Sequence, residues 1–324
     1  MSSELSKSSS HTCRSNRADE VRNIILSRST ASDIDSQVNK VLRGLGNPEP
    51  PLRLEDVREL LKLDRGYYSS TDDSFLRETI SKLTVAGAQV LKRPSLLLDA
   101  VRKLDLRALY LPDRKRILLD QAQPDAKQRW NEAHEIGHSV LPWHEDLMLG
   151  DNEHSLVPSC HAQIEAEANY AAGQLLFLQS RFRIAANDSA PSLDAIRALK
   201  GCFGNTYTTT FWRFIEDSHK DVPMIGLIGC HPRFPNDAGG DGFRHIVESP
   251  AYRSMFESIP VERLRREILT YCQFRKAGPL GSGEVSITDR RGERHIFLFE
   301  SFSNTYDCLT LATYQRPQPR VVGL

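Results

Sequence analysis

Two histidines and a glutamate stand at a spacing that could support metal chemistry. His134, Glu135 and His138 form the pattern H-E-x-x-H. Residues four positions apart on a helix share a face, so both imidazoles could bind one zinc ion while Glu135 reaches a water at the metal as a general base. Chance produces this pattern only about 0.02 times in a chain of this composition. The alternative is a pair of histidines that hydrogen-bond to the core or to solvent.

Catalytic zinc needs a third protein ligand and an open position for water. Downstream, Glu165 and Asn169 are four residues apart in a segment with strong helix-forming composition. We expect Glu165 to complete the site and Asn169 to orient His134 from the side of its imidazole that faces away from the metal. Glu167 lies about 200° around an ideal helix from Glu165 and is the weaker candidate ligand. An exposed carboxylate on a helix surface is the alternative interpretation of Glu165.

The elements around these residues can be read from the chain. We expect a helix from about 126 to 141, with Asp125 as its N-cap and Pro142 after its end, and a second helix over 164–176. Segments 106–111 and 116–120 flank a Pro-Asp turn and predict a β-hairpin.

Amphipathic patterns precede the hairpin. We expect a helix over 54–63 and another near 73–90.

The motif regions resemble one known family. Residues 129–138 (RWNEAHEIGH) and 165–176 (EAEANYAAGQLL) are similar, in sequence and in order, to the ImmA/IrrE family of zinc metallopeptidases. The resemblance covers roughly residues 50–180 and extends weakly to 217. The chain departs from the family at Gly173-Gln174 and Phe177-Leu178, and neither pair contains an expected ligand.

The resemblance implies a zincin-like α+β domain that holds Zn²⁺. It implies that His134, His138 and Glu165 bind the metal and that Glu135 is the catalytic base, with Asn169 behind the site. No other cofactor is expected.

Members of the family cleave a helix-turn-helix repressor and so release stress or mobile-element genes. The resemblance therefore implies a protein substrate of this kind and a role in transcription regulation or stress response. Two alternatives remain open: a zinc-containing regulator that acts by binding protein or DNA without proteolysis, and a peptidase used as a toxin or effector. Donors for the transition-state oxyanion could be His144, His154, His161 or Tyr170.

Residues 192–217 carry the pattern of two short helices around a Gly-containing turn, which is typical of a helix-turn-helix. The second of these helices, 206–217, has one basic residue and two acids, so direct DNA binding is disfavoured. We expect this segment to pack on the catalytic domain or to hold the substrate.

The last hundred residues read as a mixed α/β module without a ligand motif. We expect strands over 224–230, 296–302 and 309–314, the last two joined near Asn304, and a helix over 261–274. The resemblance does not reach this module at residue level, so a sensory role for it is an analogy of architecture alone.

The expected fold is α+β: a mainly helical zincin-like domain with a small β-hairpin, a helix-turn-helix-like segment, and the α/β module. The expected divisions are a disordered tail 1–17, a helical segment and linker 18–50, the peptidase domain 51–185, the helix-turn-helix-like segment 190–218, and the C-terminal module 221–324.

Composition limits the function classes. The chain has 324 residues with 42 basic and 42 acidic side chains, so no global positive charge favours nucleic acid or anionic membranes. Its apolar runs are shorter than the roughly 18–20 residues that span a bilayer. The polar N-terminus lacks the apolar stretch of a secretory signal, and the six cysteines include no C-x-x-C pair, so a cytoplasmic protein with reduced thiols is expected.

Overall fold

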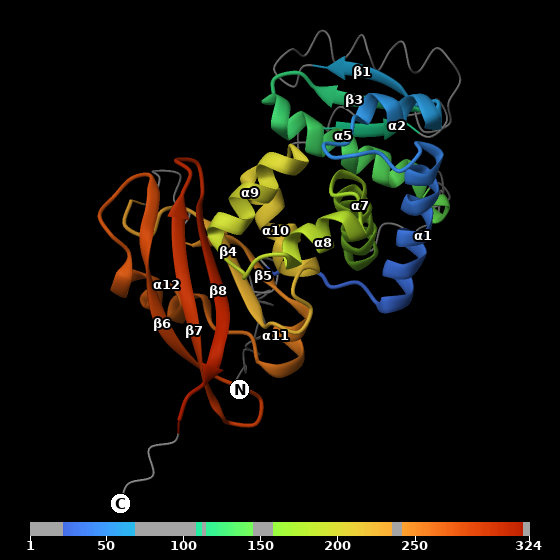
Figure 1. Ribbon diagram of the computed structural model, residues 1–324. Helices are drawn as coiled ribbons and strands as arrows, with labels where there is room; N and C mark the ends of the chain where they lie inside the picture. The colour runs from blue at the N-terminus through green and yellow to red at the C-terminus, as the bar shows by residue number, and fades with distance from the viewer. Residues whose placement is uncertain (1–21, 69–107, 112–114, 145–157, 235–241, 320–324) are drawn as a thin grey trace, which may run out of the picture.

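The computed structural model describes residues 22–68, 108–111, 115–144, 158–234 and 242–319 (Figure 1). The helices are α1 (Arg28–Gly44), α2 (Leu54–Leu61), α5 (Asp125–Val140), α7 (Pro158–Leu176), α8 (Ser180–Asn187), α9 (Leu193–Phe203), α10 (Tyr207–Asp217), α11 (Pro250–Met255) and α12 (Val261–Tyr271). The strands are β1 (Asp64–Tyr68), β2 (Ala108–Leu111), β3 (Arg116–Asp120), β4 (Met224–Gly229), β5 (Phe243–Glu248), β6 (Gly278–Thr288), β7 (Arg294–Ser303) and β8 (Cys308–Pro317). The expected α+β class is therefore correct.

A small sheet covers one side of the motif helix. Its order is β1-β3-β2, with β2 antiparallel and β1 parallel to β3, so the predicted hairpin is present and gains a strand that was not predicted. Ile117 and Leu119 of β3 are buried in the same core as Ala133 and Ile136 of α5. The sheet thereby fixes the position of the motif helix.

Helices α5 and α7 cross at close range, and a glycine permits it. A Cβ atom on Gly137 would lie 2.7 Å from the backbone oxygen of Ala168, closer than real Cβ contacts come. The one glycine inside the H-E-x-x-H motif therefore lets the two helices that carry the candidate site approach each other.

The C-terminal module is an antiparallel sheet of five strands in the order β5-β4-β8-β7-β6. Alternate residues of β4 enter different cores: Ile225 and Leu227 pack with α11 and α12, whereas Met224 and Ile228 join the core of the helical domain. The sheet thus lies between two layers of helices (Figure 1). One hydrophobic core continues from the helical domain into this sheet.

Helix α10 packs the helical domain against the sheet. Ile215 and Phe211 fill the space beside Gly226, where a Cβ atom would lie 2.1 Å from the Ile215 Cδ1 atom. The turn between α9 and α10 contains Gly204, whose φ of 66° favours glycine. The two predicted helices are present, and a helix-turn-helix role for them remains a prediction.

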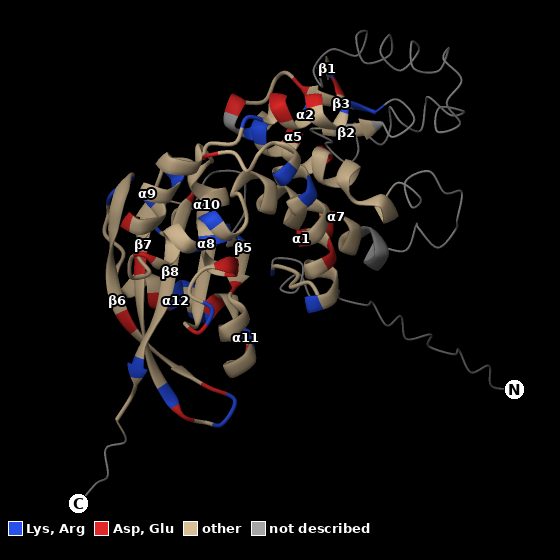
Figure 2. Cartoon of the chain, turned by 45° about the vertical axis from the view of Figure 1, so that its right-hand side comes forward, with Lys and Arg blue, Asp and Glu red and all other residues tan. Residues whose placement is uncertain are grey.

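The single basic residue of α10 is not on the surface. Arg213 is 3% exposed and its guanidinium binds the carboxylate of Asp217. Elsewhere on the described residues, Lys and Arg positions lie among Asp and Glu positions (Figure 2). This arrangement agrees with the expectation that α10 is poorly suited to bind DNA.

The segment before α1 is extended and lies on the C-terminal sheet. Arg22 forms a parallel bridge to Ile246 of β5 and an ion pair with Glu248. The side chain of Asn23 accepts a hydrogen bond from the Glu248 backbone N–H and donates one to Glu216. Chain segments more than 220 residues apart are thus joined at this sheet edge.

Several element boundaries differ from the sequence predictions. The helix expected after residue 18 begins at Arg28, since the residues before it pair with β5. Helix α5 has Pro124 as its N-cap, which places Asp125 inside the first turn. Helix α12 ends at Tyr271 rather than 274.

The long strand β6 was missed. Its residues alternate between buried and exposed, but three glycines weaken its sequence pattern. The predicted tail 1–17 and the helix near 73–90 lie outside the described residues. Within the described residues, no helix has the length and apolar character to cross a membrane.

Candidate metal centre

The structure brings together the three residues that the sequence indicated as ligands. Nε2 of His134 lies 3.1 Å from a carboxylate oxygen of Glu165, and Nε2 of His138 lies 3.7 Å from the other. The two Nε2 atoms are 3.1 Å apart. One potential ligand atom from each residue lies within 4.8 Å of the others. Helix α5 supplies both imidazoles and α7 supplies the carboxylate.

These atoms fit a tetrahedral metal ion. Zinc–nitrogen bonds of about 2.0–2.1 Å at a tetrahedral angle place two nitrogen ligands roughly 3.3 Å apart, close to the distance between His134 and His138. Two imidazole nitrogens and one carboxylate are also a donor set that zinc accepts in catalytic sites, with a fourth position left for water or substrate. The centre could therefore hold zinc or a similar divalent ion.

Asn169 fixes the orientation of the first imidazole. Its Oδ1 atom lies 3.0 Å from Nδ1 of His134. An amide oxygen can only accept, so the Nδ1 atom carries the proton and Nε2 presents its lone pair to the centre. Glu165 and Asn169 lie one helical turn apart on α7, as their spacing predicted.

A buried chain of side chains orients the second imidazole. Nδ1 of His138 lies 3.0 Å from Nδ1 of His144, and Nε2 of His144 lies 3.1 Å from the Glu167 carboxylate. Trp143 and Gln163 also donate hydrogen bonds to that carboxylate. Burial lowers the pKa of His144, so its imidazole is neutral and can accept a hydrogen bond from His138 on one nitrogen while donating one to Glu167 with the other.

This role of His144 and Glu167 was not predicted from the sequence. Glu167 was the weaker candidate ligand, and it faces away from the centre as its helical phase predicted. His144 was a candidate oxyanion donor, but it is fully buried and both of its nitrogens have partners. The signal that could have found it is its position just after the motif helix, six residues from His138.

The other proposed oxyanion donors receive no support. The Tyr170 hydroxyl donates to Asp35 on α1, away from the imidazoles. His154 lies outside the described residues, and so does the side chain of His161.

Glu135 lies beside the ligands in a buried setting. It is 7% exposed, and burial raises its pKa to about 7. The nearby Glu165 carboxylate adds to this rise, whereas His134 and a hydrogen bond from the backbone of Tyr110 oppose it. A carboxylate with a pKa in this range can take up and return a proton near neutral pH.

Ion pairs fasten the motif helix to its surroundings. Glu132, one turn before the centre and 4% exposed, contacts Arg58 of α2 at 2.5 Å and Arg65 of β1 at 3.3 Å. Breaking a buried pair of this kind leaves an uncompensated charge, which typically costs about 3–5 kcal/mol. These contacts therefore restrict how α5 can move relative to the small sheet.

Comparisons with known proteins bear on this centre. Residues 86–210 match the family model Peptidase_M78, described as an IrrE N-terminal-like domain. A solved structure described as a Mycobacterium tuberculosis transcriptional regulator is similar over 90% of this chain and 92% of that chain, with 12% sequence identity and a TM-score of 0.49. No curated protein matches. Residues 86–210, which include the His134, His138 and Glu165 centre, are thus similar to an IrrE N-terminal-like domain of the Peptidase_M78 family.

Proposed function

We propose that this protein is a zinc-dependent endopeptidase with a zincin-like active site. The observation that carries the proposal is the convergence of His134, His138 and Glu165 on one point, with Glu135 buried beside them, inside a peptidase-family domain. A metal ion held by His134, His138 and Glu165 would supply Lewis acidity, which would polarise a peptide carbonyl and lower the pKa of a water.

Glu135 takes the role of general base in this proposal. Its carboxylate accepts a proton from the attacking water and delivers it to the leaving amine. The backbone N–H of Tyr110 and the neighbouring imidazole hold the carboxylate at the centre. Asn169 and His144 act on the two imidazoles and not on the substrate.

The small sheet offers a place for an extended substrate. β2 lies at the edge of the sheet, with β3 on one side and no paired strand on the other among the described residues. Its residue Tyr110 touches Glu135. A peptide paired with this edge would pass the centre with chain continuing on both sides, which supports an endopeptidase over an enzyme that trims chain ends.

The substrate we propose is a helix-turn-helix transcriptional repressor in the cytoplasm, whose cleavage releases stress-response or mobile-element genes. This step rests on the ImmA/IrrE resemblance of the motifs. A role for α9 and α10 in holding that substrate is part of the same proposal.

A census of new protein N-termini by mass spectrometry tests this function. Cells expressing the wild type are compared with cells expressing Glu135→Gln, with and without stress. The proposal expects termini that arise only with the wild type, at an internal site of a helix-turn-helix protein. Identical termini in both strains, while deletion of the gene still alters transcription, would contradict it and favour a non-proteolytic regulator.

A further inference from the structure

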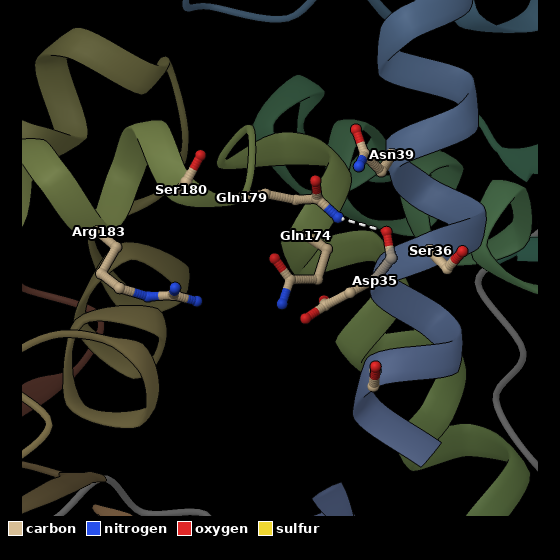
Figure 3. Close-up of a pocket in the computed structure, with 8 residues that line it drawn as sticks. Asp35, Ser36, Asn39, Gln174, Gln179, Ser180 and Arg183 are labelled. Atoms are coloured by element: carbon tan, nitrogen blue, oxygen red, sulfur yellow. Dashed lines mark hydrogen bonds between the residues drawn. The ribbon is translucent and has the colours of Figure 1, made fainter. Parts of the chain in front are cut away.

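A polar pocket of about 290 Å³ lies between α1, α7 and α8, apart from the metal centre. Its lining side chains include Asp35 and Asn39 of α1, Gln174 of α7 and Arg183 of α8, together with serine hydroxyls and Gln179 (Figure 3). None of the lining residues is apolar. The pocket is therefore unsuited to hydrocarbon groups and suited to a small ligand rich in hydrogen-bonding groups.

The floor of the pocket contains an amide without ordinary hydrogen bonds. Gln174 is fully buried, and neither its Oε1 nor its Nε2 atom has a hydrogen-bond partner. Burial raises the pKa of the neighbouring Tyr170 hydroxyl to about 12 and the Gln174 amide opposes that rise, but the contact between the two groups lacks hydrogen-bond geometry. A buried donor or acceptor left unpaired destabilises the folded state, so this residue indicates an occupant that pairs with both.

Opposite charges face each other across Gln174. Asp35 approaches from α1 and the Arg183 guanidinium from α8 (Figure 3). One oxygen of Asp35 accepts a hydrogen bond from Tyr170. Burial raises the pKa of this carboxyl group, opposed by that hydrogen bond, so a cationic partner at Asp35 would relieve an unfavourable ionisation.

The charge balance of the region restricts the ligand further. Arg183 and Arg213 both bind Asp217 of α10, one to each carboxylate oxygen. With Asp35, the cluster has two acids and two bases and no net charge. A ligand with a net charge would leave that charge unbalanced in a partly buried site, whereas a ligand with one cationic and one anionic end would not.

We propose that this pocket binds a free α-amino acid as a zwitterion, with its ammonium group at Asp35, its carboxylate at Arg183 and its polar groups paired with the amide of Gln174. The volume of about 290 Å³ is near the lower end of the range of about 300–1,000 Å³ for small-molecule sites, which suits a ligand as small as an amino acid.

The position of the pocket gives such binding a structural consequence. Gln174 and Tyr170 lie on the helix that also carries Glu165 and Asn169 of the metal centre. Asp217, the partner of Arg183, lies on the helix that packs on the C-terminal sheet. The ligand would therefore contact the junction between the catalytic helix and the C-terminal module. This inference does not depend on peptidase activity.

Thermal unfolding of the full-length protein, with each of the twenty amino acids added singly at about 10 mM, tests the proposal. A ligand present at about ten times its Kd stabilises the folded state by roughly 1.4 kcal/mol, which is measurable as a rise in Tm. We expect one or a few amino acids to raise the Tm saturably and calorimetry to confirm one site per chain. Glycine betaine, which has both charges but no N–H donor, should bind at least about tenfold more weakly.

Two variants make the test specific. Gln174→Met is close in shape and removes the unpaired amide, so the free protein should keep or raise its Tm while amino-acid binding weakens at least about tenfold. Arg181→Gln is the control: Arg181 is on α8 outside the pocket and pairs with Glu49, so binding should be unchanged.

Three results would overturn the proposal. The first is no Tm shift from any amino acid, with a high-resolution structure showing only ordered water at Gln174. The second is equal binding by wild type and Gln174→Met. The third is Gln174-dependent binding of a neutral polyol such as glycerol in place of amino acids.

Discussion

Nδ1 of His138 and Nδ1 of His144 lie 3.0 Å apart in the interior behind the candidate metal centre. Only one of these nitrogens can carry the proton of this hydrogen bond. If His138 uses Nε2 as a metal ligand, its Nδ1 atom is the donor, and His144 must then donate its own proton to Glu167. The metal-binding form of His138 is thus selected by a residue that never touches the metal.

His144→Ala should weaken metal binding without removing a ligand. Loss of the group behind a ligating imidazole typically lowers metal affinity about 10–100-fold, because the ring is no longer held in one orientation and tautomer. Competition against a chromophoric chelator measures this. Glu167→Gln should give a smaller loss in the same direction, since an amide oxygen still accepts from His144.

A control variant separates the loss of metal affinity in His144→Ala from any effect of simply replacing a histidine. His231 lies in the C-terminal module, where its ring contacts the Arg275 backbone oxygen, so His231→Ala should leave metal affinity unchanged. Wild-type affinity in a correctly folded His144→Ala protein would refute the positioning role.

Gly137→Ala should damage both stability and the centre. The added methyl group would meet the Ala168 backbone oxygen at 2.7 Å, so α5 and α7 must separate. Overpacking of this kind costs about 1–3 kcal/mol, partly offset by the better helix propensity of alanine. Because the ligands come from both helices, metal affinity should fall as well.

Gly201→Ala is the matched control for this substitution. Gly201 is also inside a helix, but nothing lies within 4 Å of an added Cβ atom. The change should be neutral or stabilise the protein by up to about 1 kcal/mol. Equal Tm values for the two alanine variants would show that the helix crossing has more room than the structure indicates.

The sequence predicted the candidate centre better than its surroundings. The helical spacing of His134, His138, Glu165 and Asn169 is local information, and the hairpin of β2 and β3 needs only a short turn. β1 was missed because its parallel pairing with β3 joins segments about fifty residues apart and leaves no local alternation to detect.

Other features depend on tertiary contacts that no local pattern encodes. The role of His144 requires α7 to bring Glu167 against the end of α5. The place of Arg22 and Asn23 beside β5 requires contacts across the whole chain. The packing of Phe211 and Ile215 against Gly226 likewise appears only once α10 lies on the sheet.

Glu216→Gln should stabilise the protein at alkaline pH. Burial raises the pKa of Glu216 above the ordinary 4.5, while hydrogen bonds from Asn23 and Trp212 oppose the rise. A carboxyl group whose pKa is higher in the folded state favours folding at pH below 4.5 and loses that contribution as the pH rises through the folded-state pKa.

Glutamine resembles the protonated form of Glu216, and its amide oxygen can still accept from Asn23. The Tm difference between Glu216→Gln and wild type should therefore be near zero at about pH 4.5 and positive at about pH 8. Thermal unfolding across this range measures it. A difference that stays constant with pH would contradict the raised pKa.

The zinc content of purified wild type, Glu135→Gln and Glu165→Gln, measured by mass spectrometry after equal dialysis against a weak chelator, tests the metal centre itself. We expect about one zinc per chain in the wild type and in Glu135→Gln, because Glu135 is proposed as a base and not as a ligand, and a clear loss in Glu165→Gln. Equal zinc content in all three proteins would contradict the assignment of Glu165 as a ligand, and no zinc in the wild type would contradict the metal centre itself.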